Sequence, residues 1–305
     1  DVNTTPLHIA FDEACKRAGE RGLRVTGSEI VGLVPLNSML DAGRYFLKKQ
    51  QRSTGLPEEE LIRIAIRSLG LNELYEFKPQ EKIIEYVLAG DDQNRLTNMS
   101  LTAFANEVAS ESPAPGGGSV AAYTTAMGMA LGNMVANLSS HKRGWDDRWE
   151  EFSGWAEKGM IIQSDLLELV DEDTQAFKGI MDAFGMPKNT PEETKDRDAA
   201  IHEATRYAIQ VPFKVMETGL KAMEIIEAMV LTGNPNSVSD AGVGALAVRS
   251  GILGAWLNIK INIAGLSDKS YKEDMLKKSE KIATAAEKAE QEILRLVDSK
   301  IKEQS

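Results

Sequence analysis

Three consecutive glycines form the part of the chain whose composition most suggests binding chemistry. Gly116, Gly117 and Gly118 follow Pro115 and precede Ser119, where a long, largely apolar run begins. At the first turn of a helix the backbone N–H groups are free and the helix dipole is positive, so this geometry suits an anion such as phosphate or carboxylate. A flexible turn into a helix is the alternative, and it is the commoner meaning of a short glycine run.

Carboxylates that could transfer a proton occur at two places. Asp171 and Asp173 flank Glu172 inside a predicted long helix, although aspartate is a poor helix former. The two aspartates point about 200° apart, so at most one faces a given pocket. A solvated acidic face is the alternative, and it is favoured for Glu172. Asp240 lies in the first turn of a later helix, either as an acid or base beside the glycine run or as a favourable charge at the helix dipole.

Four further polar side chains are candidate ligand contacts. Asn258 and Asn262 are four residues apart on one face of an apolar helix, either as satisfied core amides or as contacts to a ligand. Lys188 and Asn189 lie between two predicted long helices, where the lysine could meet an anionic ligand or be an ordinary surface charge. The residues alone leave both pairs open.

Composition and charge argue against several kinds of function. The 305 residues include 46 acidic and 35 basic side chains, for a net charge of −11, so binding to a nucleic-acid backbone is not expected. One cysteine, Cys15, excludes an intrachain disulfide and a cysteine-rich zinc site, and three widely separated histidines argue against a multi-histidine metal site. The single cysteine suits a reducing cytoplasm.

An uncharged stretch raises the question of a membrane. Residues 120–138 carry no charge, but they are rich in alanine and glycine and include Thr124, Thr125 and Asn133. A spanning helix needs about 20 predominantly apolar residues. We therefore predict a buried, closely packed helix of a soluble bundle and no membrane interaction.

The elements that must position these groups are mostly long helices. Prolines recur in the first ninety residues but are absent from 116–186 and from 236 to the end, which favours long helices. A short helix is predicted at 100–110. The predicted long helices cover 119–140, 146–184, 190–231, 237–265 and the residues from 267 to the end. Five long helices with short connections make an up-and-down bundle, so the predicted fold class is mainly all-α.

Local signals mark three points in this bundle. Thr190 followed by Glu193 predicts a capping box, with Pro191 in the first turn. Pro212 lies inside the same helix and is expected to kink it, because proline lacks the N–H that the helix uses. Ser267 is predicted to cap the last helix.

The first ninety residues have a mixed pattern. Helices are predicted at 6–21, 36–50, 57–69 and 78–88. Leu23–Val34 carries β-branched residues and predicts one strand, which Pro35 ends. One strand with several helices is not a complete sheet, so we expect an α/β fragment of a longer protein, with partner strands upstream of Asp1. The polar run at 90–98 predicts a linker, which gives domains at 1–90 and 101–305 and a linker at 91–100.

Motifs in both segments occur in an order shared by a known family. Those of the second segment are Ser112–Ala122, Val170–Asp173, Pro187–Glu193, Ser239–Asp240 and Asn258–Asn262, and those of the first are Val25–Leu36, Arg67–Leu71 and Glu81–Tyr86. Residues 101–305 resemble the cyclodeaminase domain of the formimidoyltransferase-cyclodeaminases, folate enzymes of histidine breakdown and one-carbon metabolism. The first segment resembles the C-terminal part of the formimidoyltransferase half.

The resemblance implies a reaction. In this family 5-formimidoyltetrahydrofolate cyclises to 5,10-methenyltetrahydrofolate with loss of ammonia, as folate N10 attacks the formimidoyl carbon. A base must take the N10 proton, and an acid must protonate the leaving nitrogen. We predict Asp240 as the first candidate for this acid–base group and Asp171 or Asp173 as the second.

The resemblance also implies how the substrate is held. The glycine run with Ser119 would hold part of the folate, including a carboxylate of its glutamate tail. The further candidate contacts are Lys188, Asn189, Asn258 and Asn262. No metal site and no cofactor are predicted, because the reduced folate, including polyglutamylated forms, is the substrate. We expect a homodimer or higher homo-oligomer in the cytoplasm, with the folate site near the subunit interface.

Two other functions are open. The bundle also resembles methenyltetrahydrofolate cyclohydrolases, which hydrolyse the same product, although the attached transferase segment favours the cyclodeaminase. A non-catalytic helical assembly domain is the second alternative, and the costly polar groups on apolar helices argue against it. The transferase subdomain that bears the catalytic histidine in the family has no counterpart here, so formimidoyl transfer is expected only in a longer parent chain.

Overall fold

A computed structural model of the chain describes residues 4–89 and 95–304. The described residues up to 89 form one compact unit together with Ser139–Glu157, and a second unit contains 95–138 and 158–304. Across these described ranges the regular structure is helical, and an isolated parallel bridge joins Val34 and Ile83. The predicted domain limits at 1–90 and 101–305 stay a prediction, since residues 91–94 of the linker lie outside the described ranges.

The first unit is built from short amphipathic helices. They are α1 (Leu7–Gly19), α2 (Leu36–Lys49), α3 (Glu58–Leu69), α4 (Pro79–Lys82) and α5 (Ile84–Ala89). α2 and α3 pack against each other, and their apolar faces bury Met39, Phe46, Leu61 and Ile62 in one core. Burial of such a face is what stabilises helices of this length.

The predicted strand at Leu23–Val34 is wrong. Among these residues Val34 alone takes part in a β-bridge, in which its N–H donates to Lys82 O and its carbonyl accepts from Ile84 N (2.9 and 3.0 Å). Val31 is 89% exposed. A β-branched run forms a strand only when a neighbouring strand supplies its hydrogen bonds, and the described residues contain none. The same bridge at Ile83 divides the predicted helix 78–88 into α4 and α5.

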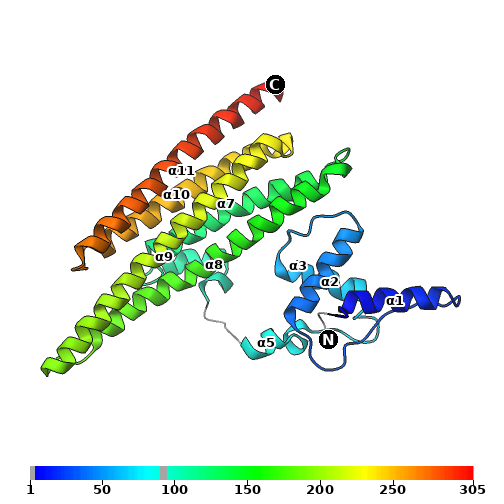
Figure 1. Ribbon diagram of the computed structural model, residues 1–305, viewed down its shortest axis with the longest axis horizontal. Helices are drawn as coiled ribbons and strands as arrows, with labels where there is room; N and C mark the ends of the chain where they lie inside the picture. The colour runs from blue at the N-terminus through cyan, green and yellow to red at the C-terminus, as the bar shows by residue number, and fades with distance from the viewer. Residues whose placement is uncertain (1–3, 90–94, 305) are drawn as a thin grey trace. The chain divides into compact units, whose positions relative to one another are not determined.

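The second unit contains most of the predicted bundle (Figure 1). The short α6 (Leu101–Val108) precedes α7 (Gly117–Ser140), α8 (Trp149–Gly185), α9 (Pro191–Thr232), α10 (Val238–Ile263) and α11 (Lys269–Gln304). The end of α7 and the start of α8 belong to the first unit. Short 3₁₀ turns occur at η1 (Leu96–Asn98), η2 (Asp146–Arg148) and η3 (Pro235–Ser237). α10 packs on α9 and α11, and α9 also packs on α11. The mainly all-α fold and the five long helices are confirmed.

Hydrogen bonds at the helix starts test the predicted caps. Thr190 Oγ1 accepts from Glu193 N (3.1 Å) and Glu193 Oε2 accepts from Thr190 N (3.2 Å), so the predicted capping box is present. Ser267 is not the cap of α11. Asp268 takes that role, because its Oδ1 accepts from Tyr271 N (3.0 Å), and aspartate caps helices as well as serine does.

α7 and α10 approach each other closely because their facing residues are small. A Cβ added to Gly128 would lie 2.6 Å from Gly244 O, which real side chains do not allow. The fully buried Thr125 of α7 is satisfied within the helix, since it donates its hydroxyl to Ala121 O (2.8 Å). The prediction of a buried, closely packed helix at 120–138 is therefore confirmed.

One helix passes a simple test for a membrane span. Pro235–Ile263 is long and apolar enough, because an 18-residue window within it has a mean hydropathy of 1.3. However, 44% of that window is buried inside the protein. The core helix of a helical bundle meets the same criterion. Its length and composition therefore do not by themselves indicate a membrane.

A proline inside α9 is compensated by a side chain of α10. Pro212 is buried in the middle of α9, which continues through it over 42 residues. Because proline has no N–H, the carbonyl of Ala208, four residues earlier, loses its helical donor. Asn262 of α10 supplies a replacement, since its Nδ2 donates to Ala208 O at 2.8 Å. This contact explains a polar residue in an apolar helix.

Candidate active site at the start of helix α7

The glycine run begins α7 beside a carboxylate of α8. Ser119, in the first turn of α7, is fully buried, and its Oγ donates to Asp173 Oδ2 at 2.9 Å. The same hydroxyl lies 3.2 Å from Thr174 Oγ1. The Ser119 backbone N–H also favours the ionised form of Asp173. The anion that faces the N-terminus of α7 is therefore a side chain of the protein itself.

Gly118 must lack a side chain for this arrangement to exist. A Cβ at Gly118 would lie 2.1 Å from Asp173 Oδ1. A Cβ at Gly117 would lie 3.4 Å from Asn258 Nδ2 of α10, whereas one at Gly116 would have open space. The glycine run thus brings α7, α8 and α10 to one point, with Asp173 and Asn258 beside it.

The electrostatics of Asp173 suit proton transfer. Burial raises the pKa of this carboxyl above its ordinary value, and hydrogen bonds from the Ser119 hydroxyl and backbone only partly oppose the shift. Asp173 therefore keeps its proton to a higher pH than an exposed aspartate does. A carboxyl tuned in this direction is better able to donate and accept a proton near neutral pH.

Asp171 has a different task from Asp173. Its carboxylate accepts hydrogen bonds from Leu96 N (2.7 Å), Thr97 Oγ1 (3.1 Å) and Arg95 Nε (3.2 Å). These contacts fasten η1, which lies in the predicted linker, to α8. The two aspartates thus face different neighbours, as their spacing predicts, and the geometry gives no support to a catalytic role for Asp171.

Asp240 lies far from this cluster within one chain. It is in the first turn of α10, and Asn258 follows 18 residues later on the same continuous helix. At a helical rise of about 1.5 Å per residue the two residues are about 27 Å apart. The expectation that Asp240 lies beside the glycine run is therefore wrong for a single chain, and a favourable charge at the helix dipole accounts for its position.

Lys188 and Asn189 are also remote from Asp173. α8 continues for 12 residues beyond Asp173, which is about 18 Å, before the exposed connection that contains both residues. Asn189 N donates to Glu193 Oε2 at 2.7 Å, and Lys188 O accepts from Thr194 Oγ1 at 3.5 Å. Their contacts in one chain serve the start of α9.

The structure separates the predicted binding residues into two groups. Asn258 stays with the cluster, where its Nδ2 donates to Gly254 O (2.9 Å) and lies near Gly117. Asn262 is instead the partner of the Ala208 carbonyl. The candidate residues brought together are Gly117, Gly118, Ser119, Asp173 and Asn258, and those left apart are Asp171, Lys188, Asn189, Asp240 and Asn262.

A second polar cluster was missed from the sequence. Glu172 Oε1 accepts from Tyr207 OH (2.7 Å) and Lys214 Nζ (2.8 Å) of α9. Burial opposes ionisation of Glu172, but these two donors outweigh it and lower its pKa. Burial and the Glu172 carboxylate raise the pKa of Tyr207 to about 12. The spacing of seven between Tyr207 and Lys214, which places them on one helix face, is the signal that could have found this cluster.

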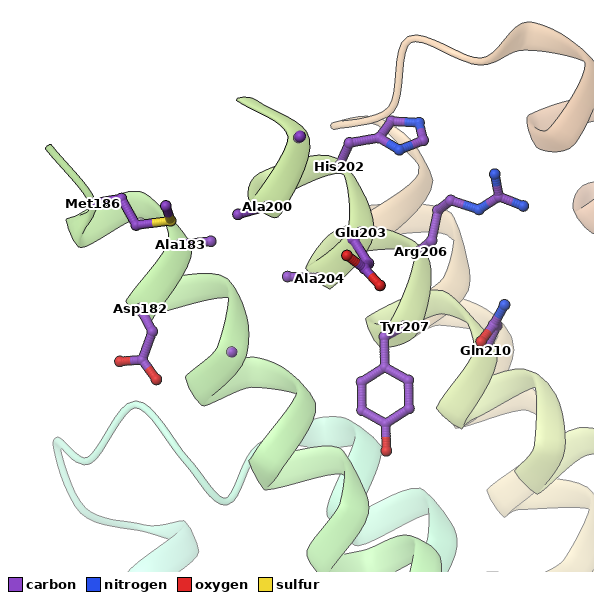
Figure 2. A pocket seen from close by; sticks show the side chains of 12 residues that line it. Asp182, Ala183, Met186, Ala200, His202, Glu203, Ala204, Arg206, Tyr207 and Gln210 are labelled. Atoms are coloured by element: carbon purple, nitrogen blue, oxygen red, sulfur yellow. The ribbon is translucent and has the colours of Figure 1, made fainter. Parts of the chain in front are cut away.

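A groove of about 980 Å³ extends along α8 and α9 near this second cluster (Figure 2). Its walls carry Gly179, Asp182, Ala183 and Met186 of α8 and Ala199, Ala200, His202, Glu203, Ala204, Arg206, Tyr207 and Gln210 of α9. In the part of the chain that the structure describes, no group of three or more His, Cys, Asp or Glu side chains could hold a metal ion.

Comparisons with known proteins match both parts of the chain. The family described as Formiminotransferase-cyclodeaminase matches residues 100–298, and the Formiminotransferase domain family matches residues 1–89. The formimidoyltransferase-cyclodeaminase of Rattus norvegicus is 38% identical over 275 residues, which are 90% of this chain and 50% of that protein. The chain therefore spans about half the length of this relative.

Two further similar proteins match about two thirds of the chain. The methenyltetrahydrofolate cyclohydrolase of Methylorubrum extorquens is 35% identical over 204 residues, or 67% of this chain and 98% of that protein. The crystal structure of formiminotetrahydrofolate cyclodeaminase from Thermotoga maritima superposes with a TM-score of 0.59 at 27% identity and covers 67% of this chain and 98% of that one. With a family match over residues 100–298 and a relative matched along nearly its whole length, the chain belongs to the formiminotransferase-cyclodeaminase family.

Proposed function

We propose that this chain converts 5-formimidoyltetrahydrofolate into 5,10-methenyltetrahydrofolate and ammonia, in histidine breakdown and one-carbon metabolism. Family membership supplies the reaction class. The observation that carries the site is the Asp173 carboxyl, which is partly buried at the start of α7, accepts a hydrogen bond from Ser119 Oγ and has a raised pKa. Among the three carboxylates predicted from the sequence, we choose Asp173 because it accepts a hydrogen bond from another candidate residue, Ser119.

The reaction needs one group that can both take and give a proton. Folate N10 forms a bond to the formimidoyl carbon and loses its proton, and the former imine nitrogen gains protons and leaves as ammonia. The product bridge is cationic, so a nearby carboxylate also stabilises the charge that develops. Asp173 supplies these functions in our proposal, with Ser119 Oγ orienting its carboxyl. Asn258 and the open Gly116–Gly117 backbone would contact the folate.

Substitution of Asp173 tests this assignment. Asp173→Asn keeps the size of the side chain but removes the exchangeable carboxyl proton, so ammonia release should fall by roughly 100-fold or more. Asp171→Asn, two residues earlier on α8, is the control, and it should change stability more than turnover. If Asp173→Asn folds normally and keeps activity within a few-fold of the parent, the assignment to Asp173 fails.

Asp240 remains a candidate only through a second copy of the chain. Within one chain it is about 27 Å from Asn258, so a catalytic Asp240 would have to come from a partner subunit. Asp240→Asn then lowers ammonia release as Asp173→Asn does, and mixing the two variants restores part of the activity, because a mixed dimer contains one intact site. If Asp240→Asn keeps full activity, Asp240 has no catalytic role and serves as a favourable charge at the N-terminus of α10.

We also propose a homodimer or higher homo-oligomer, and exposed apolar side chains of the bundle support this. Met127 of α7 is 48% exposed, and Val243, Leu257 and Ile261 of α10 are 55%, 65% and 73% exposed. Large exposed apolar side chains of this kind are expected to be covered by a partner subunit when they form a large patch. Sedimentation equilibrium at low micromolar concentration should give about twice the chain mass or a higher multiple, and a stable, active monomer contradicts the proposal.

Hydrolysis of the methenyl bridge is the second candidate function. The identity of 35% over 98% of a methenyltetrahydrofolate cyclohydrolase favours it specifically. Ammonia released from 5-formimidoyltetrahydrofolate indicates the cyclodeaminase. Consumption of 5,10-methenyltetrahydrofolate without such release indicates the cyclohydrolase. A chain that binds no reduced folate in calorimetry is the assembly domain considered as the other alternative.

Two wider assignments complete the proposal. Formimidoyl transfer to tetrahydrofolate would belong to a longer parent chain, since this chain spans about half of the rat relative. A cytoplasmic location suits the single cysteine, Cys15. Cell fractionation and an assay for formimidoyl transfer from formimidoylglutamate test these two points.

A further inference from the structure

The hydroxyl of Ser119 has a second neighbour besides Asp173. Thr174 follows Asp173 on α8, and its Oγ1 lies 3.2 Å from Ser119 Oγ. Ser119 is fully buried in the first turn of α7, so bulk water does not compete for its hydrogen bonds. Two consecutive side chains of α8 therefore meet a single hydroxyl of α7.

The direction of these two hydrogen bonds follows from the protons available. An ionised carboxylate can only accept, and a serine hydroxyl has one proton to donate. That proton of Ser119 goes to Asp173 Oδ2 at 2.9 Å. The bond between the two hydroxyls then runs the other way, with Thr174 Oγ1 donating to Ser119 Oγ. Thr174, Ser119 and Asp173 thus form a hydroxyl chain that ends on the carboxylate.

Thr174 differs from other threonines inside the helices. A helical threonine can donate its hydroxyl to the carbonyl four residues earlier. Thr124, Thr125 and Thr205 do so at 2.7, 2.8 and 2.7 Å. Among the hydrogen bonds of the described residues, Thr174 makes no such bond, and its hydroxyl meets Ser119 instead. Its contact joins two helices, whereas the other three serve their own helix.

Close packing keeps the hydroxyl chain at this spacing. A Cβ added to Gly118 would lie 2.1 Å from Asp173 Oδ1, so the backbone of α7 lies directly against the carboxylate. A hydroxyl that accepts one hydrogen bond becomes a better donor in the next, so the two bonds strengthen each other. The contact of Thr174 is therefore felt at Asp173 through Ser119.

The charges near Asp173 leave its acidity to this hydroxyl chain. Asp171 and Glu172, the preceding residues of α8, each pair with a cation of another element (3.2 and 2.8 Å). The helix α7 carries no charged side chain. Burial raises the pKa of Asp173, and the hydrogen bonds from Ser119 oppose that rise. The pKa of Asp173 therefore reports on the Ser119 hydroxyl and, through it, on Thr174.

We propose that Thr174 is a positioning residue for the reaction, which holds the Ser119 hydroxyl toward the carboxyl of Asp173. Without the threonine hydroxyl, Ser119 loses the donor behind it and is freer to turn away. The carboxyl then loses part of its orientation and part of the stabilisation of its ionised form. This role rests on the proposed function, because it concerns how Asp173 takes the N10 proton.

Thr174→Val tests this role, because valine has the shape of threonine without the hydroxyl. Ammonia release should fall by about 5-fold, less than in Asp173→Asn, since one neutral hydrogen bond is lost. The acid limb of the pH profile should move to higher pH, because the ionised carboxyl is less stabilised. Thr174→Ser keeps the hydroxyl and should restore both. Thr124→Val, which removes a half-buried hydroxyl that bonds only within α7, is the matched control and should change neither.

A loss of activity at all pH values, with an unmoved acid limb and no recovery in Thr174→Ser, would show a merely structural role. Turnover of Thr174→Val equal to that of the parent overturns the positioning role as well. Circular dichroism checks the fold, and Thr174→Ala replaces the valine variant if that variant does not fold.

A double-mutant cycle shows whether Thr174 acts through Ser119. Ser119→Ala should lower ammonia release by about 10-fold. With alanine at position 119 there is no hydroxyl to hold, so adding Thr174→Val should change turnover by less than about 2-fold. An equal loss from Thr174→Val in both backgrounds would mean that the two residues act independently, which contradicts the hydroxyl chain.

Carbon-13 NMR of the aspartate carboxyls separates this role from the proposed reaction, because it needs no substrate. The Asp173 signal is identified by its absence in Asp173→Asn. Its pKa should be higher in Thr174→Val than in the parent and in Thr124→Val. If this difference is seen but the parent releases no ammonia, the proposed reaction fails and the hydroxyl chain stands. Equal pKa values in the parent and Thr174→Val overturn the hydroxyl chain, whatever the turnover.

Discussion

Two helix pairs of the bundle use small residues in opposite ways. Between α7 and α10, Gly128 faces the Gly244 backbone so closely that an added Cβ would lie 2.6 Å from its carbonyl oxygen. Along α8 and α9, Gly179 has no neighbour within 4 Å of an added Cβ, and a groove of about 980 Å³ stays open. Small residues thus allow close packing between α7 and α10, whereas between α8 and α9 they leave a groove open.

Small residues therefore have two different structural effects in this bundle. At α7 they fix the position of a helix whose first turn carries Ser119 and, through it, Asp173. At α8 and α9 they shape a surface. Substitution to alanine adds one methyl group at either place, so it measures the difference directly.

The largest effect is expected for Gly128→Ala. The added methyl would lie 2.6 Å from Gly244 O and 2.9 Å from Val248 N, both rigid backbone atoms, so the helices must separate. We expect a loss of about 3 kcal/mol in the free energy of unfolding. Urea unfolding followed by circular dichroism measures it. An unchanged midpoint would show that the two backbones are not in close contact.

A smaller loss is expected for Asn262→Leu in the last turn of α10. Leucine cannot donate to the Ala208 carbonyl, which Pro212 has deprived of its helical donor, so a buried acceptor is left unpaired. The free energy of unfolding should fall by about 1–3 kcal/mol. The control is Asn262→Leu made together with Pro212→Ala, since the restored N–H should recover part of the loss. Equal effects in both backgrounds contradict the compensation.

Gly179→Ala is expected to change stability least among the substitutions and in the opposite direction. The methyl enters open space, and alanine is the better helix former, so the protein should gain about 0.5–1 kcal/mol. The same urea experiment detects the gain. Destabilisation similar to that of Gly128→Ala would show that α8 and α9 are closed in solution and that the two helix pairs do not differ.

The smallest effect concerns pH and the carboxylate at the start of α7. The pKa of Asp173 is raised in the folded protein above the ordinary value of 3.8, so the folded state holds this proton more tightly than the unfolded state. Its contribution to stability is therefore largest at low pH and declines as pH rises through the folded pKa. The stability of the parent relative to Asp173→Asn should fall as pH rises above the ordinary aspartate pKa of 3.8. A rise instead of a fall would contradict the raised pKa.

Local signals made most of the bundle predictable. Proline spacing, the Thr190–Glu193 capping box and the apolar periodicity act within a few residues, and they gave the five long helices. The strand at Leu23–Val34 depended on partners elsewhere, and the helical unit that forms without them could not be inferred from β-branched residues. Ser267 and Asp268 are adjacent good caps, and only the hydrogen bond to Tyr271 distinguishes them.

The part of the candidate site at the N-terminus of α7 could be predicted from the sequence. A glycine run before a helix indicates an anion site, and the structure places Asp173 there. The sequence could not show that the anion belongs to the protein, because that depends on how α7 lies against α8. Asp240 and Lys188 failed to join the cluster for the same reason, since long helices carry motif residues tens of ångströms apart.

Pro212 and Asn262 act together on the Ala208 carbonyl although fifty residues separate them. A relative with an ordinary residue in place of Pro212 has an N–H for the Ala208 carbonyl and gains nothing from an amide on α10. A relative that keeps the proline but loses the amide carries an unpaired buried carbonyl. We therefore expect the two positions to change together across the family, so that an alignment would show them as a covarying pair.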